Sequence, residues 1–175
     1  MKLTFTERFR ALAQNPIEAI KRMGITEGQT VVDIGAGTGY FTIPAAETVG
    51  VKGMVYSVEP DPTRSQRIQE RVTSEGLPNV RVITTGAERL VDIPTESLDL
   101  AFSAFTLHHF NDRQVGLSEI RRVLRKGGVF YVWDRVPGSI IRHGTRPDEL
   151  PPLAFGFTSF EQLGSGKTLR ARFTK

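Results

Sequence analysis

The sequence contains no cysteine, which excludes disulfide bonds, thiolate catalysis and cysteine-ligated metal sites. It has no apolar run near the ~20 residues that a membrane-spanning helix needs, and its first residues carry no signal-peptide core. Only 3 histidines are present, and their spacing offers no ligand set, so we expect no bound metal. These absences favour a cytoplasmic protein that does not enter the membrane.

The composition is typical of one globular domain. The 175 residues are 39% hydrophobic and 24% charged, which is enough to bury a core but leaves no room for a second domain. The net charge is +4, yet the basic residues are scattered along the chain rather than gathered in one run. A nucleic-acid partner is therefore not favoured.

The most informative segment is residues 31–40, which read VVDIGAGTGY. The β-branched apolar residues at its start favour a buried parallel strand. Gly35, Gly37 and Gly39 then allow a sharp turn and leave the main chain open to a ligand. Residues 41–49 predict a helix whose N-terminus points free N–H groups at that ligand. Strand, glycine turn and helix together predict a nucleotide-type binding site.

The spacing of the glycines separates two kinds of nucleotide site. Turns that hold a dinucleotide read G-x-G-x-x-G, because they must bind a pyrophosphate. Here a carboxylate, Asp33, stands two residues before Gly35; it would repel a diphosphate but suits a ligand with an ammonium group. S-adenosylmethionine is such a ligand, and the segment resembles motif I of the class I S-adenosylmethionine-dependent methyltransferases.

A second acidic residue supports an adenosine-containing ligand. Residues 54–58 predict a short strand that ends at Glu59, twenty residues past Gly39. A carboxylate at about this distance is placed to accept hydrogen bonds from both ribose hydroxyls. Enzymes that use NAD have the same arrangement, so Glu59 indicates adenosine without deciding between the two cofactors.

Helices and strands alternate along most of the chain, and this order predicts a parallel sheet covered on both faces. Gly127 and Gly128 are expected to stop the helix before the fifth strand, and two final strands form a hairpin. We therefore predict an α/β fold: a Rossmann-like, doubly wound, mostly parallel seven-stranded sheet with a C-terminal antiparallel hairpin. The single domain divides into N-terminal helices (1–24), a cofactor-binding core (25–134) and a C-terminal loop and hairpin (135–175). The expected helices are 5–12, 16–23, 41–49, 62–76 and 112–124, and the expected strands are 30–34, 54–58, 80–84, 98–104, 129–133, 155–163 and 169–174.

A further segment, SAFTLHHF at residues 103–110, makes the resemblance more specific. Together with EIRRVLRKGG at residues 119–128, it is similar to the ubiquinone/menaquinone C-methyltransferase subgroup (methyltransferase type 11). In that subgroup the segment runs under the cofactor and its histidines face the methyl-transfer pocket. The resemblance implies that Phe105 lies against the cofactor and that His108 faces a small-molecule methyl acceptor, as a candidate general base. The cofactor contacts implied in this way are Asp33, Gly35, Ala36, Gly37, Thr38, Gly39, Glu59, Pro60, Gly86, Ala87, Glu88, Ser103 and Phe105.

One departure from the family pattern affects the adenine end. Members often have an aspartate where this chain has Gly86, so Glu88, the backbone or water would have to hold the adenine amino group. Three other functions stay open at this stage. An NAD-dependent oxidoreductase is disfavoured by the glycine spacing and Asp33, a non-catalytic S-adenosylmethionine-binding module is left open by the short substrate lid, and an RNA methyltransferase is suggested only by the basic pI.

Overall fold

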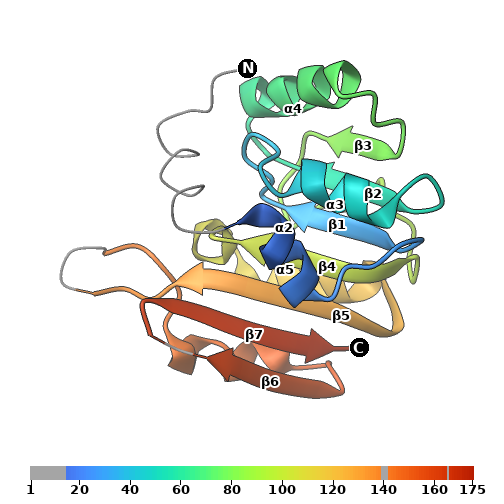
Figure 1. Ribbon diagram of the computed structural model, residues 1–175. Coiled ribbons are helices and arrows are strands. Elements are labelled where there is room, and N and C mark those ends of the chain that lie inside the picture. The colour runs from blue at the N-terminus through green and yellow to red at the C-terminus, as the bar shows by residue number, and fades with distance from the viewer. Residues whose placement is uncertain (1–14, 139–141, 165) are drawn as a thin grey trace.

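The structure, a computed structural model, describes residues 15–138, 142–164 and 166–175. Within these ranges the strands form one seven-stranded sheet in the order β3-β2-β1-β4-β5-β7-β6 (Figure 1). The predicted sheet is therefore confirmed. Its strands are β1 (Thr30–Ile34), β2 (Met54–Val58), β3 (Val80–Ile83), β4 (Leu98–Ala104), β5 (Leu124–Arg135), β6 (Ser159–Gly164) and β7 (Thr168–Thr174).

The first five strands run parallel, and the last two reverse direction. β1 pairs in parallel with β2 on one side and β4 on the other, and β7 pairs antiparallel with both β5 and β6. The order of the strands reverses between β1 and β4, because the chain goes from β1 outward to β3 and then returns to the other side. The carboxyl ends of strands at such a switch point are where open α/β sheets bind ligands.

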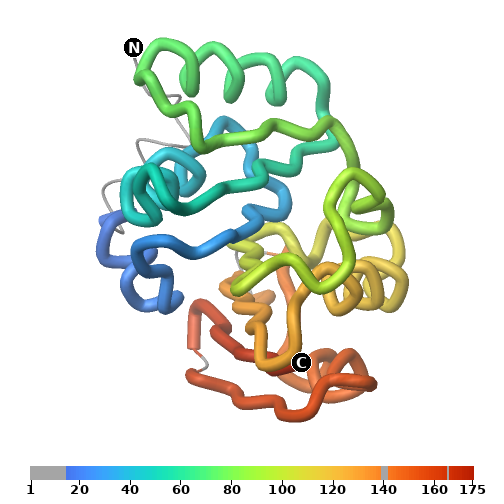
Figure 2. The backbone as a smooth tube through the Cα atoms, turned by 90° about the vertical axis from the view of Figure 1, so that its right-hand side faces the viewer, coloured from blue at the N-terminus to red at the C-terminus, as the bar shows by residue number. Residues whose placement is uncertain are grey.

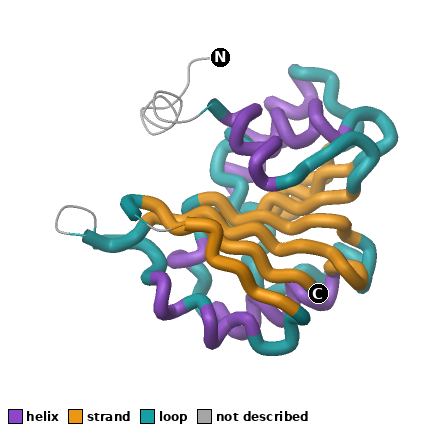
Figure 3. The backbone as a smooth tube through the Cα atoms, turned by 60° about the horizontal axis from the view of Figure 1, so that its bottom comes forward, coloured by secondary structure: helices purple, strands orange, loops and turns teal. Residues whose placement is uncertain are grey.

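Helices cover both faces of this sheet, as the predicted doubly wound arrangement requires. Figure 2 shows α2 (Pro16–Met23) and α3 (Thr42–Val49) on one side of the strands and α5 (Arg113–Val123) on the other. α4 (Pro62–Ser74) packs near the edge strand β3 (Figure 1), and Figure 3 shows helices above and below the strands. Because both faces are covered, β1 is buried from Val31 to Ile34, which explains its continuous apolar character apart from one carboxylate.

The predicted stop of α5 at the two glycines is wrong. The helix ends at Val123, and Leu124 already has an extended backbone and pairs with Leu98 at the start of β5. Gly127 and Gly128 lie inside the strand, where the pairing with β4 shifts register. Gly127 adopts φ +74° there, which glycine tolerates at no steric cost. Pairing with β4 and β7 thus decides the local structure, rather than the tendency of glycine to end a helix.

The C-terminal hairpin is confirmed, although β6 begins later than predicted, at Ser159. Two short 3-10 turns, Pro147–Glu149 and Pro151–Ala154, stand between β5 and β6. Of the two N-terminal helices, the second is α2 with Asn15 as its N-cap, and the one expected at 5–12 lies outside the described residues. Among the described helices, none is long and apolar enough to cross a membrane.

Candidate active site

The glycine turn follows β1 and is tied to the end of β2. The N–H groups of Gly35 and Ala36 both donate to the carbonyl oxygen of Val58, at 2.8 and 3.0 Å. Gly35, Gly37 and Gly39 have φ values of 73°, 64° and 80°. These left-handed conformations favour glycine, so the alternate-residue spacing is explained by backbone geometry.

The three glycines differ in the space around them. A Cβ atom added at Gly35 would lie 2.6 Å from the side chain of Thr106, whereas one added at Gly37 would meet no atom within 4 Å. Thr106 is held over Gly35 because its hydroxyl donates to the Ile34 carbonyl at 2.8 Å and bonds to Ser103 at 2.7 Å. The side chain of Thr106 therefore covers the backbone at Gly35, whereas the backbone at Gly37 is open to a ligand. α3 begins directly beyond this turn, and no side chain caps its N-terminus.

Asp33 lies beneath the turn and is 2% exposed. Its Oδ2 accepts the hydroxyl of Thr42 at 2.7 Å, and this hydroxyl also bonds to Ser57 at 3.0 Å. The carboxylate thereby joins β1, α3 and β2. A negative charge in this position disfavours a bound diphosphate, as the sequence suggested, while a direct contact with an ammonium group stays a prediction.

Glu59 connects the two predicted cofactor elements. It is 3% exposed, and its Oε2 accepts the N–H of Gly37 at 2.8 Å. Its Oε1 accepts the N–H of Asp61 at 3.2 Å and lies 3.8 Å from the guanidinium of Arg64. The carboxylate thus stands at the open part of the turn, where its role toward a ribose stays a prediction.

The residues predicted to lie at the adenine end of the cofactor are Gly86, Ala87 and Glu88. Ala87 is 4% exposed and belongs to the core on the α5 side, so only its backbone is available to a ligand. The Oε1 atom of Glu88 accepts the N–H groups of Asn111 and Asp112 at 2.7 and 3.2 Å. Its Oε2 would lie 2.7 Å from a Cβ added at Gly86. A glycine at this position therefore leaves room for the neighbouring glutamate.

The remaining predicted contacts lie at the same ends of the strands. The carbonyl oxygen of Thr38 accepts a hydrogen bond from Arg71 at 3.0 Å, and Pro60 is exposed just after Glu59. Ser103, near the end of β4, is fully buried.

Phe105 follows β4 in a strained conformation. Its φ is 62°, which a residue with a side chain rarely adopts, and its N–H donates to the carbonyl of Trp133 at 2.6 Å. The two rings pack with centroids 5.0 Å apart. Strain of this kind costs on the order of 1–3 kcal/mol and concentrates at functional sites.

His108 lies in the short 3-10 turn Leu107–His109 and is paired with Asp134, near the end of β5. Its Nδ1 is 2.8 Å from Oδ1 and 3.0 Å from Oδ2 of that carboxylate, and its backbone N–H donates to Oδ2 at 3.1 Å. The His108 side chain is 7% exposed, whereas His109, whose ring centroid is 4.0 Å away, is exposed. The structure thus distinguishes the two adjacent histidines.

Asp134 is fully buried and has further hydrogen-bond donors. The hydroxyl of Thr145 donates to Oδ2 and the N–H of Arg135 to Oδ1, both at 2.8 Å. Burial alone would raise the pKa of Asp134, but the hydrogen bonds from His108 and Thr145 outweigh it and hold the pKa below its ordinary value. An ionised carboxylate can only accept hydrogen bonds, so Nδ1 of His108 carries a proton, and in the neutral form of the ring the lone pair is therefore on Nε2. Sequence reasoning missed Asp134, although a carboxylate at the end of the fifth strand was a usable signal.

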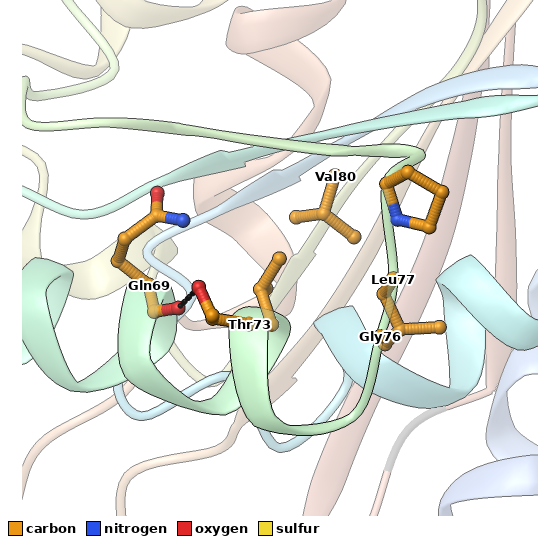
Figure 4. Close-up of a pocket in the computed structure, with 7 residues that line it drawn as sticks. Gln69, Thr73, Gly76, Leu77 and Val80 are labelled. Carbon is orange, nitrogen blue, oxygen red and sulfur yellow. Dashed lines mark hydrogen bonds between the residues drawn. The ribbon is translucent and has the colours of Figure 1, made fainter.

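A hollow of about 480 Å³ lies elsewhere, between α4 and the start of β3 (Figure 4). It contains none of the predicted cofactor residues, and Pro78, one of its lining residues, stands before the start of β3, whereas the glycine turn follows the end of β1. The lining residues are Gln69, Val72, Thr73, Gly76, Leu77, Pro78 and Val80.

Comparison with known proteins agrees with this geometry. Residues 32–132 match the family described as a methyltransferase domain. The chain belongs to this methyltransferase family. It is 31% identical over 112 residues to a demethylmenaquinone methyltransferase of Geobacillus stearothermophilus, covering 64% of this chain and 47% of the relative. It is 30% identical over 125 residues to an aklanonic acid methyltransferase of a Streptomyces species, covering 71% and 54%.

A solved structure resembles nearly the whole chain. The S-adenosylmethionine-dependent methyltransferase of Aquifex aeolicus superposes with a TM-score of 0.77 at 25% identity, covering 91% of this chain and 88% of that one. The family resemblance inferred from the sequence is confirmed, and the family implies S-adenosylmethionine as the cofactor. The open backbone at Gly37, with Glu59 beside it, fits such a ligand. The chain spans about half the length of the curated relatives it matches.

Proposed function

We propose that this chain transfers a methyl group from S-adenosylmethionine to a small-molecule acceptor, with His108 as general base. The observation that carries this proposal is the His108–Asp134 pair, because it presents an oriented imidazole at the carboxyl end of the sheet. A module that only binds the cofactor has no need of a buried carboxylate that fixes the tautomer of a histidine. The pair therefore favours catalysis over binding alone.

The glycine turn and Glu59 are the proposed cofactor site. The methionine part would lie along the backbone at Gly37, where nothing lies within 4 Å of an added Cβ, and Glu59 would accept hydrogen bonds from the ribose. When bound, S-adenosylmethionine supplies an electrophilic methyl group and leaves as S-adenosylhomocysteine. The carboxylate of Asp33 beneath the turn disfavours a pyrophosphate there, so an NAD-dependent reaction is disfavoured.

His108 would take the proton that the acceptor loses. Asp134 holds the Nδ1–H, so the lone pair of Nε2 can accept a proton from an O–H or an acidic C–H as the new bond to the methyl carbon forms. The imidazolium that results is stabilised by the ionised Asp134. A positioned base of this kind contributes roughly 10²–10⁴-fold to the rate.

The relatives suggest the acceptor class. Their names include a demethylmenaquinone and an aklanonic acid methyltransferase. We propose a ring-bearing small molecule whose acceptor atom carries an acidic proton, because this is the chemistry in which the base is useful.

Transfer of label from methyl-labelled S-adenosylmethionine to demethylmenaquinol, aklanonic acid and simpler phenols tests this function. Wild-type protein should label at least one acceptor, and His108→Gln should lower that rate by roughly 10²–10⁴ without weakening S-adenosylhomocysteine binding. The matched control is His109→Gln, which should retain activity within a few-fold because this neighbour is exposed and lies outside the Asp134 pair. Cofactor binding without labelling of any acceptor would instead identify a non-catalytic module.

A further inference from the structure

The end of β5 presents two hydrogen-bond donors beside Phe105. Trp133 and Arg135 are two positions apart on the strand, so their side chains leave the same face of the sheet. The Trp133 ring centroid lies 5.0 Å from that of Phe105, and the guanidinium carbon of Arg135 lies 5.6 Å from the same centroid. Phe41, the residue directly before α3, also packs against Trp133, with ring centroids 6.1 Å apart. The two donors therefore converge on one aromatic cluster.

The indole nitrogen of Trp133 is unusual in this cluster. The side chain is in the buried core at 6% exposure, and its Nε1 finds no hydrogen-bond acceptor among the described residues. Buried donors are almost always paired, and an orphan is costly, so an unpaired one points to a missing acceptor.

Arg135 lacks a negative partner in the same place. Arg135 is a half-buried residue, and across residues 15–138, 142–164 and 166–175 no carboxylate lies within ion-pair distance of its guanidinium. Asp134, its neighbour in sequence, points to the opposite face and already accepts hydrogen bonds from His108, Thr145 and the backbone. A partly desolvated arginine charge without a counterion favours an anionic ligand.

We propose that Arg135 and Trp133 determine acceptor specificity by binding the carboxylate of a ring-bearing acid. One carboxylate oxygen would accept the indole N–H, the guanidinium would bind the other, and the ring would pack against Phe105. This inference rests on the proposed function, since it assigns the acceptor to the same edge of the sheet as His108. The competing ligand is the cofactor's own carboxylate, but the residues predicted to hold its methionine part follow β1, and β4 separates β1 from β5.

Trp133 is the only tryptophan of the chain, so its fluorescence reports directly on this site. The probes are 4-hydroxybenzoate and its neutral partner 4-hydroxybenzamide, and 3-hydroxy-2-naphthoate with its amide, each titrated by calorimetry into protein saturated with S-adenosylhomocysteine. At least one acid should bind about ten- to a hundredfold more tightly than its amide, as expected for one charge-assisted hydrogen-bond pair. When the indole of Trp133 is excited selectively, binding of 4-hydroxybenzoate should also shift its fluorescence emission.

Two variants and one control locate the effect. Arg135→Gln should reduce the preference for acid over amide to less than about threefold. Trp133→Phe should also reduce it, because it keeps an aromatic ring but has no N–H. Arg67→Gln, at an exposed arginine of α4, removes the same charge and should leave the preference unchanged. If Arg135→Gln does not fold, Trp133→Phe still decides the question by calorimetry.

Three results would overturn the inference: equal affinity for acid and amide, no binding of either acid to the loaded protein, or an unchanged preference in Trp133→Phe. A tenfold loss of S-adenosylhomocysteine affinity in Arg135→Gln would also overturn it, by assigning these donors to the cofactor. Failure of S-adenosylhomocysteine itself to bind would instead reject the proposed function, so the two failures are distinguishable.

Discussion

Substituting Gly35 and Gly37 by alanine, one at a time, should separate the structural and the binding roles of the glycine turn. Both residues have positive φ, at 73° and 64°, so each alanine has the same kind of backbone strain. They differ in what the new methyl group meets. At Gly35 it would lie 2.6–2.8 Å from three atoms of Thr106, whereas at Gly37 it would meet nothing within 4 Å.

The expected magnitudes follow from these contacts. The left-handed conformation costs an alanine about 1–2 kcal/mol relative to glycine. At Gly35 the methyl group must also displace Thr106, whose hydroxyl bonds to Ile34 and Ser103. Losing two such bonds adds about 1–3 kcal/mol. Gly35→Ala should therefore lower the free energy of unfolding by about 2–5 kcal/mol, and Gly37→Ala by about 1–2 kcal/mol.

Cofactor affinity should show the opposite order. The methyl group at Gly37 projects into the space proposed for the methionine part, so Gly37→Ala should weaken S-adenosylhomocysteine binding by at least about tenfold. Urea unfolding followed by circular dichroism gives the stabilities, and calorimetry on the folded variants gives the affinities. The reasoning is refuted if Gly37→Ala binds S-adenosylhomocysteine like the wild type, or if it destabilises the fold as much as Gly35→Ala.

Three further predictions concern other buried polar groups. Glu59→Gln should weaken S-adenosylhomocysteine binding about tenfold or more in calorimetry, because one charge-assisted hydrogen bond contributes about 1.5–3 kcal/mol; unchanged affinity would place Glu59 outside the cofactor site. Asn79→Ala should lower the free energy of unfolding by about 1–3 kcal/mol in urea, because its amide donates to two carbonyl oxygens at the end of α3, at 2.8 and 2.9 Å; a loss below about 0.5 kcal/mol would contradict this. The pKa of Asp134 is lower in the folded state than in the unfolded state. The ionised carboxylate should therefore contribute fully to stability above the unfolded-state pKa of about 4, and this contribution should be lost as the pH falls from there through the folded-state pKa. Urea unfolding between pH 3 and 7 should show this decline in the wild type and less of it in Asp134→Asn. An equal dependence of the free energy of unfolding on pH in the two proteins would contradict the lowered pKa of Asp134.

Local features of the sequence were sufficient for much of the fold and for the cofactor end of the site. The glycine turn could be located because strand, carboxylate and alternate glycines are contiguous, and Glu59 because strand lengths in a βαβ unit vary little. The structure then showed what these residues contact, such as the bond between Glu59 and the N–H of Gly37.

Features that depend on pairing between distant strands could not be predicted. The start of β5 was misplaced because pairing of Leu124 with Leu98 overrides the helix-ending tendency of the glycines that follow. His108 and Asp134 are 26 residues apart in the sequence, and their pairing depends on the register in which Ala104 lies opposite Trp133. No local pattern reports that register, so the histidine was found and its partner was missed.

Parallel calorimetric titrations of the wild-type protein with S-adenosylhomocysteine and with NAD distinguish a methyltransferase site from a dinucleotide site. We expect saturable heat with S-adenosylhomocysteine at one site per chain and none with NAD, because the turn is open at Gly37 and has the Asp33 carboxylate beneath it. Saturable binding of NAD, with no response to S-adenosylhomocysteine, would contradict it.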